Sequence, residues 1–210
     1  NPERHPNFNE PDNSYGGVVW GKAVPELRGA NVPFAVRARV CLLRDLGSAL
    51  APDNAFAIIQ GLETVALRMK QHCENAEKVV NFLKKHKEVT KVIYSTEHEK
   101  KIADRAKQYL KGGNGPMVGI ELKGGIEAGK KFIESLKMFY HVANIGDARS
   151  LAIHPASTTH SQLNEKELAA SGVTQSYVRL CIGIEHIDDI IDDLDQALNK
   201  SSKGSLKAVS

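Results

Sequence analysis

Residues 177–182, which read YVRLCI, form the stretch that decides the fold, because this composition is typical of a β-strand. Side chains alternate between the two faces of a strand, so Val178, Leu180 and Ile182 are expected on one face, and Tyr177, Arg179 and Cys181 on the other. An arginine on a packed face needs an anion, because burying an unpartnered guanidinium is costly. Its planar fork can bind a carboxylate through two hydrogen bonds. A salt bridge to an Asp or Glu of the same chain is the alternative.

Strand-like and helix-like segments alternate on both sides of this stretch, from residue 89 onward. The expected strands are 89–94, 117–122, 141–144, 150–153 and 177–182, and the expected helices are 99–110, 126–139, 165–170 and 187–198. Helices of this length between short strands can cover one face of a small sheet. The pattern predicts an α/β or α+β sandwich.

The part of the chain before residue 89 differs in character. Residues 1–33 are rich in Asn, Pro, Asp and Gly and are expected to be loop-like, although their aromatic side chains need a surface to pack on. Helices are predicted over 34–46, ended by Gly47, and over 54–86. Gly61 could bend the second of these helices, which is longer than average.

Composition excludes several classes of protein. The 210 residues are 41% hydrophobic, with 28 basic and 25 acidic residues and a net charge of +3. This excludes a disordered chain, a collagen and a disulfide-stapled miniprotein. The charges are interspersed and no long apolar run occurs, so neither nucleic-acid binding nor a membrane span is expected. Cys41 and Cys181 stand in apolar runs, which favours buried thiols in a reducing compartment, the cytoplasm.

Three polar segments are candidates for chemistry. Residues 144–150 form a Gly-containing turn that could offer polar groups to a ligand or simply reverse the chain. Residues 154–161 hold two histidines with Ser and Thr between them, but the spacing fits no zinc pattern and no serine nucleophile motif. Residues 112–115 follow a helix and precede a strand, which is the reverse of a phosphate-binding loop. No metal site is expected.

Five ordered blocks resemble the Cys/Met-metabolism family of enzymes that depend on pyridoxal 5'-phosphate (PLP). The blocks are ARVCLLRDLG (38–47), QGLETVALRM (60–69), ANIGDARSL (143–151), HPASTTHS (154–161) and VRLCIGIE (178–185). The resemblance covers about residues 5–200. Within the family, the form of residues 144–150 is similar to the O-acetylhomoserine sulfhydrylase branch, whereas the cystathionine-handling branches resemble Ser-Leu-Gly-Gly there.

The resemblance implies a fold and an assembly. The fold is the C-terminal part of the type I, aspartate-aminotransferase-like, fold of PLP-dependent transferases: a small α/β sandwich domain plus the end of the large domain. Residues 1–65 would be the C-terminal end of the large PLP-binding domain and the start of an inter-domain helix. Residues 66–200 would be the small domain, and residues 201–210 a flexible tail. The implied partners are the missing N-terminal part of the same enzyme and further copies, as a homotetramer built from two dimers.

The resemblance also implies an activity, the conversion of O-acetyl-L-homoserine and sulfide to L-homocysteine and acetate in methionine biosynthesis and transsulfuration. The Schiff-base lysine and the main contacts to PLP are expected upstream, so no catalytic residue is expected here and this chain alone is expected to be inactive. Arg179 matches the arginine that holds the substrate α-carboxylate. Asn144 lies next to that carboxylate, and Thr159 borders the pocket. Arg44 and Asp45 match a segment that approaches the active site of a neighbouring subunit.

Other functions remain open at this point. A related PLP-dependent cystathionine synthase or lyase, or a methionine γ-lyase, would share most of these blocks. A non-catalytic α/β domain that binds a partner chain, or a stand-alone amino-acid-binding module that uses Arg179, is an alternative of another class. A Ser-x-Thr-Lys turn encoded upstream of Asn1 would favour the enzyme.

Overall fold

The computed structural model describes residues 4–23 and 32–202. Contacts divide the chain into two units, Asn1–Gly61 and Leu62–Ser210, and each is described by itself. Most of the predicted tail, residues 203–210, lies outside the described residues. Within the described ranges, no helix combines the length and apolarity needed to cross a bilayer.

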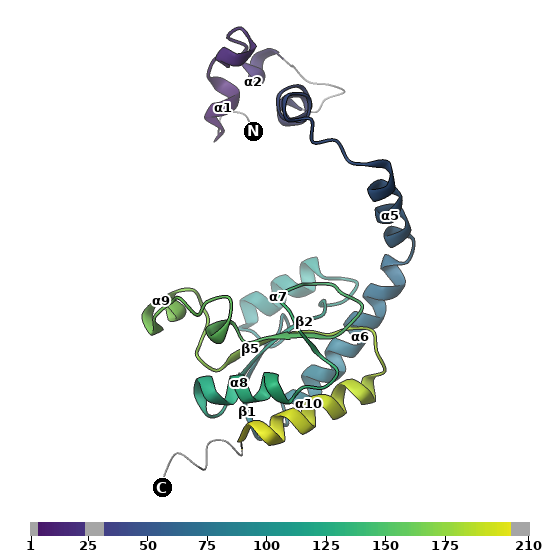
Figure 1. Ribbon diagram of the computed structural model, residues 1–210, viewed down its shortest axis with the longest axis vertical. Coiled ribbons are helices and arrows are strands. Elements are labelled where there is room, and N and C mark those ends of the chain that lie inside the picture. The colour runs from purple at the N-terminus through teal and green to yellow at the C-terminus, as the bar shows by residue number, and fades with distance from the viewer. Residues whose placement is uncertain (1–3, 24–31, 203–210) are drawn as a thin grey trace. The chain divides into compact units, whose positions relative to one another are not determined.

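The larger unit is built on one five-stranded sheet, in the order β1-β2-β5-β4-β3 (Figure 1). All neighbouring strands run antiparallel except β3 and β4, which are parallel. Strand β5 lies at the centre, paired with β2 on one side and β4 on the other. The strands are β1 (Val89–Ile93), β2 (Met117–Leu122), β3 (Tyr140–His141), β4 (Leu151–Ile153) and β5 (Tyr177–Cys181).

Three helices cover one face of this sheet: α6 (Val65–Leu83), α8 (Gly125–Ser135) and α10 (Ile187–Ser201). Val178, Leu180 and Ile182 join their apolar side chains in one core and are fully buried, which confirms the predicted alternation along β5. Helix α7 (Lys100–Tyr109) lies at the other face (Figure 1). There, Ile102 lines a pocket with residues of β2 and β5. The short helix α9 (Glu165–Ala170) begins at a capping box formed by Asn164 and Glu167.

Several predicted boundaries in this unit were wrong; α10, for example, ends at Ser201 rather than at residue 198. The helix expected over 126–139 ends at Ser135, because the carboxylate of Asp193 in α10 accepts hydrogen bonds from the backbone N–H groups that follow it, those of Lys137, Met138 and Phe139. A carboxylate that binds several consecutive N–H groups holds them out of helical conformation. The strand expected over 141–144 is only Tyr140–His141, and the exposed residues after it form a loop.

The predicted helix over 54–86 is two helices, α5 (Pro52–Glu63) and α6. The break falls at Thr64, whose φ of −109° and ψ of 1° are not helical, rather than at Gly61. The helix expected over 34–46 is present as three consecutive segments: α3 (Pro33–Arg37), a π-helical turn η3 (Ala38–Leu43) and α4 (Arg44–Leu46).

The smaller unit gives the N-terminal aromatics the surface that their sequence requires. Phe8, Trp20 and Cys41 are buried together, so residues far apart in sequence pack against the π-helical turn. The indole N–H of Trp20 donates to Asp12 at 2.9 Å. The segment is therefore not simply loop-like, and residues 24–31 lie outside the described residues. Its short helices are α1 (Pro6–Asn9), η2 (Asn13–Tyr15) and α2 (Trp20–Ala23).

One histidine of the 154–161 segment is a core residue. His154 is fully buried, and its ring contacts Ser157 Oγ and the carbonyl of Gln175, both at 2.8 Å. Gly129 of α8 makes room for the ring, because a Cβ there would overlap His154 Nε2. Burial lowers the pKa of His154 from its ordinary value of 6.5, although the hydrogen bond to Gln175 opposes this.

We therefore expect acid to destabilise the larger unit through His154. The unfolded chain binds the proton more readily than the folded one, so this contribution to stability is present above about pH 6.5 and is lost as the pH falls below it. Urea unfolding of wild type and His154→Asn over this range measures the effect. The same pH slope in both proteins would contradict it.

Phe132 is the largest fully buried side chain of the core, on α8. Phe132→Ala is expected to lower the free energy of unfolding of the larger unit by about 3–5 kcal/mol, from lost apolar contacts and the cavity left behind. Tyr109→Ala is the matched control, since this aromatic is 73% exposed, and should change stability by less than about 0.5 kcal/mol. Urea denaturation followed by circular dichroism compares the two, and equal losses would contradict the assignment of the core.

Candidate functional site

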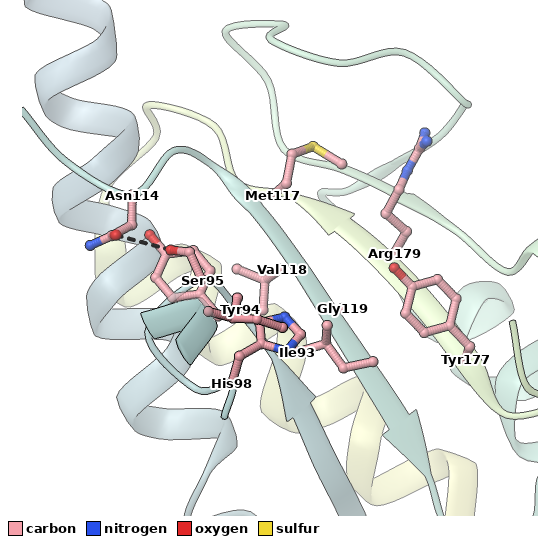
Figure 2. A pocket seen from close by; sticks show the side chains of 11 residues that line it. Ile93, Tyr94, Ser95, His98, Asn114, Met117, Val118, Gly119, Tyr177 and Arg179 are labelled. Carbon is pink, nitrogen blue, oxygen red and sulfur yellow. Dashed lines mark hydrogen bonds between the residues drawn. The ribbon is translucent and has the colours of Figure 1, made fainter. Parts of the chain in front are cut away.

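Arg179 stands on the face of the sheet opposite the three core helices. Its strand neighbours Val178 and Leu180 point into the core, so the two-residue period turns Arg179 the other way. Gly119 of β2 and Ile153 of β4 are its partners across the ladders. Figure 2 shows the side chain extending away from the sheet, with Tyr177 beside it.

The guanidinium of Arg179 has backbone carbonyls as its protein partners. Nη2 donates to the carbonyl oxygen of Ala143 at 2.8 Å and makes a long contact of 3.5 Å to that of Asn144. Among the residues that the structure describes, no carboxylate lies within ion-pair distance of Arg179. The internal salt bridge left open by the sequence is therefore not formed there. The group keeps its full positive charge and further N–H donors for an anion.

A pocket of about 410 Å³ lies beside the guanidinium (Figure 2). Its walls come from β1, β2, β5 and the start of α7. At the end away from Arg179, Ser95 Oγ donates a hydrogen bond of 2.9 Å to Asn114. The lining residues are Ile93, Tyr94, Ser95, His98, Ile102, Asn114, Met117, Val118, Gly119, Tyr177 and Arg179.

Gly119 and Tyr177 shape the floor of this pocket. A Cβ at Gly119 would lie 2.6 Å from Cε2 of Tyr177, so only glycine lets the ring lie across β2. Burial raises the pKa of Tyr177, although the charge of Arg179 opposes this. The phenol therefore remains protonated at neutral pH and can donate a hydrogen bond. The sequence placed Tyr177 on the face of Arg179 but gave it no role, and nothing in the sequence marked Gly119.

The loop that carries Asn144 meets Arg179 through its backbone. The carbonyls of Ala143 and Asn144 face the guanidinium, and the backbone N–H of Gly146 donates to Cys181 Sγ at 3.3 Å. Burial raises the pKa of Cys181, so the sulfur is a neutral thiol and a weak acceptor. Cys181 is buried, as its apolar neighbours predicted.

The other candidate residues are not brought to Arg179 by any described contact. Thr159 is exposed after the 3₁₀ turn η4 (Pro155–Ser157), and its hydroxyl lies 2.9 Å from His160 Nδ1. Arg44 and Asp45 belong to the smaller unit, 4.0 Å apart between Nε and Oδ1. There, Tyr15 donates its hydroxyl to Asp45 at 3.0 Å and to the carbonyl of Val40 at 2.7 Å.

Comparisons with known proteins agree on one family. The model of the Cys/Met metabolism PLP-dependent enzymes matches residues 13–199. An O-acetyl-L-homoserine sulfhydrylase of Leptospira meyeri is 51% identical over 197 residues, which cover 91% of this chain and 44% of the relative. An L-methionine gamma-lyase of Fusobacterium nucleatum is 40% identical over 189 residues, covering 90% of this chain and 46% of the relative.

A solved structure confirms the predicted fold class. It is a putative O-acetylhomoserine (thiol)-lyase of Campylobacter jejuni, crystallised with a pyridoxyl-lysine phosphate group, and is 42% identical with a TM-score of 0.78. The match covers 94% of this chain and 45% of that one, so the chain spans less than half the length of the proteins it matches. The α/β fold is that of the type I PLP-dependent transferases, and this chain belongs to the Cys/Met metabolism family of PLP-dependent enzymes.

Proposed function

We propose that the chain is the C-terminal part of a PLP-dependent sulfhydrylase that converts O-acetyl-L-homoserine and sulfide to L-homocysteine and acetate in methionine biosynthesis. The observation that carries this proposal is Arg179, a charged guanidinium at a pocket with no described carboxylate partner. The names of the relatives support the substrate, and the form of residues 144–150 favours this branch over the cystathionine-handling branches.

Arg179 holds the α-carboxylate of the amino acid substrate in this proposal. Nη2 is already engaged by the carbonyl of Ala143, which fixes the plane of the guanidinium. The remaining N–H groups then meet the two carboxylate oxygens in a bidentate pair. A carboxylate held in one orientation places the rest of the substrate reproducibly, and that positioning lowers the barrier of the reaction. Asn144 would contact the same carboxylate, and Thr159 would border the pocket.

The described residues do not fit the whole PLP site. In the Campylobacter jejuni structure, the pyridoxyl phosphate group is joined to a lysine. Every lysine that the structure describes is exposed, and none lines the pocket of Arg179. We therefore propose that this chain supplies the part of the site that binds the substrate carboxylate. The lysine that holds PLP would belong to sequence outside this chain. PLP would supply the electron sink for the chemistry.

Exposed apolar side chains support a larger assembly. On α5, Phe56 is 64% exposed, and on the first turns of α6, Leu67 is 72% exposed. Large exposed apolar side chains are typical of surfaces that another protein segment covers. We propose that the rest of the enzyme and further copies cover them, in a cytoplasmic dimer of dimers. Residues 1–65 would then complete the large domain and 66–200 form the small domain, with Arg44 and Asp45 near a neighbouring subunit's site.

Substitution of Arg179 tests the carboxylate role in the full-length enzyme. Arg179→Lys keeps the charge but not the fork, so kcat/KM for O-acetyl-L-homoserine should fall by roughly ten- to several-hundred-fold. Arg179→Ala should cost more, because it removes the charge as well. Thermal melting should change little in both variants, since the described protein partners of the side chain are two carbonyls.

A different pattern would contradict this role. If Arg179 has only a structural function, Arg179→Ala lowers the melting temperature sharply while kcat/KM at low temperature stays near the wild-type value. PLP content, measured by absorbance after release in alkali, is the control. It should be unchanged in both variants, because the proposed contacts to PLP lie outside this chain.

The isolated 210-residue chain should form no covalent adduct with PLP at a defined lysine. Its described lysines are exposed and none lines the pocket of Arg179, so none is held where PLP would be oriented for Schiff-base formation. Borohydride reduction after incubation with PLP, followed by peptide mass spectrometry, measures this. Stoichiometric label on one lysine would contradict the assignment, whereas scattered trace label would not.

A further inference from the structure

The loop that holds Arg179 has few contacts of its own. Residues 141–149 are all exposed, and no helix or strand forms between His141 and Leu151. Exposed loop backbone of this kind is mobile unless other elements hold it. The carbonyl of Ala143 nevertheless accepts a hydrogen bond from the Arg179 guanidinium and so helps to orient it. The position of the loop therefore needs anchors from outside.

Most of the described anchors come from one short stretch, residues 179–185. Two others involve Tyr140, whose N–H donates to the carbonyl of Ser150 at 3.0 Å and whose ring centroid lies 4.7 Å from the Arg149 guanidinium. Arg179 donates to the carbonyl of Ala143, Cys181 accepts from the N–H of Gly146, and the N–H of Ile184 donates to the carbonyl of Ala148 at 2.9 Å. The anchors that remain lie at Ser150, the only fully buried residue at this end of the loop.

Glu185 provides the strongest of these anchors. Its carboxylate accepts the backbone N–H of Ser150 at 2.6 Å on one oxygen and the hydroxyl of Ser150 at 2.9 Å on the other. Hydrogen bonds to a carboxylate are roughly twice as strong as neutral ones. The Ser150 hydroxyl in turn accepts the N–H of Gly183 at 2.9 Å, so both its donor and its acceptor functions are used. No cation lies within ion-pair distance of Glu185 among the described residues.

Gly183, just beyond the end of β5, lies close to the backbone of the loop. A Cβ there would overlap the Glu185 carboxylate and would lie 2.5 Å from the backbone N of Ser150 and 2.6 Å from the carbonyl O of Ala148. Only glycine permits this approach. The backbone of the loop is therefore pressed against the stretch that carries Glu185.

Helix α6 holds that stretch from behind. Asn75 is fully buried, and its side-chain N–H₂ donates to the carbonyls of Gly183 and Glu185 at 3.1 and 2.9 Å. His72 is also buried, and its Nδ1 lies 2.7 Å from the carbonyl of Ile182, so this nitrogen carries the proton. The backbone of Glu185 is thus fixed to the core, and its side chain transmits that rigidity to the loop.

We propose that Glu185 is a positioning residue for the substrate carboxylate: through Ser150 it fixes the loop 143–150, and the loop fixes the guanidinium of Arg179. This inference rests on the proposed function of Arg179. Glu185 need not touch the substrate, and its effect on catalysis passes through Arg179.

Kinetics of the full-length enzyme test the proposal. Glu185→Ala should lower kcat/KM for O-acetyl-L-homoserine about tenfold, which is the factor expected when one charge-assisted hydrogen bond that positions the loop is lost. It should leave kcat/KM for sulfide unchanged. Glu185→Gln keeps an acceptor for the N–H of Ser150 and should recover part of the loss. Glu97→Ala is the matched control. It breaks an ion pair of 2.7 Å to Lys84 away from the loop and should lower only the melting temperature.

A double-mutant cycle separates positioning from mere stabilisation. In an Arg179→Ala background, Glu185→Ala should reduce kcat/KM no further, because the group it positions is absent. The same tenfold loss in both backgrounds would overturn the proposal, as would a Glu185→Ala enzyme that only melts earlier. If Glu185→Ala fails to fold, Glu185→Gln takes its place in the cycle, with an expected loss of about threefold.

Amide hydrogen exchange tests the anchoring of the loop by Glu185 without any assumption about the reaction. In the 210-residue chain, Glu185→Gln should speed exchange of the Ser150 and Gly146 amides, whereas Glu97→Ala should not. Unchanged exchange at both amides overturns the inference. If exchange rises but Arg179→Ala leaves kcat/KM intact, the proposed function of Arg179 fails and the positioning role in catalysis fails with it, while Glu185 remains the anchor of the loop.

Discussion

Strand β5 presents opposite chemistry on its two faces, and this constraint organises the larger unit. On one face, Val178 and Leu180 lie buried under α6, α8 and α10. On the other, Arg179 and Tyr177 line an open pocket. Because β5 is the central strand, with β2 and β4 paired to its two edges, its alternation also sets which residues of its neighbours enter the core. The alternation of side chains along β5 therefore determines both the core and the pocket of Arg179.

The sequence predicted those parts of the structure that depend on short-range pattern. Strand 117–122 has the expected bounds, and β5 differs by one residue at its end. The two faces of β5 follow from periodicity alone. The juxtaposition of Arg179 with the Asn144 loop came from the family resemblance, because nothing in the local sequence states that residues 35 apart meet.

Contacts between residues far apart in the sequence explain most of the features that the sequence did not predict. Helix α8 ends early because Asp193, more than fifty residues away, binds the N–H groups beyond it. The bond from Glu185 to Ser150 is of the same kind, a carboxylate that meets backbone donors far along the chain. The roles of Gly119 and Gly183 could not be predicted from the sequence either, because each role depends on which neighbouring atoms a Cβ at that position would overlap. Such contacts have no period, so hydrophobic patterning does not reveal them.

The position of Arg179 has a consequence for how the chain folds. A slip of β5 by one residue against β2 would turn the guanidinium into the core and Val178 or Leu180 out to water. Burying that charge without a partner would cost several kcal/mol, in addition to the lost apolar burial. Misregistered forms of the sheet are thus unstable as well as inactive. The same arginine that gives the pocket its charge also selects the correct register during folding, so stability and activity are selected together at this position.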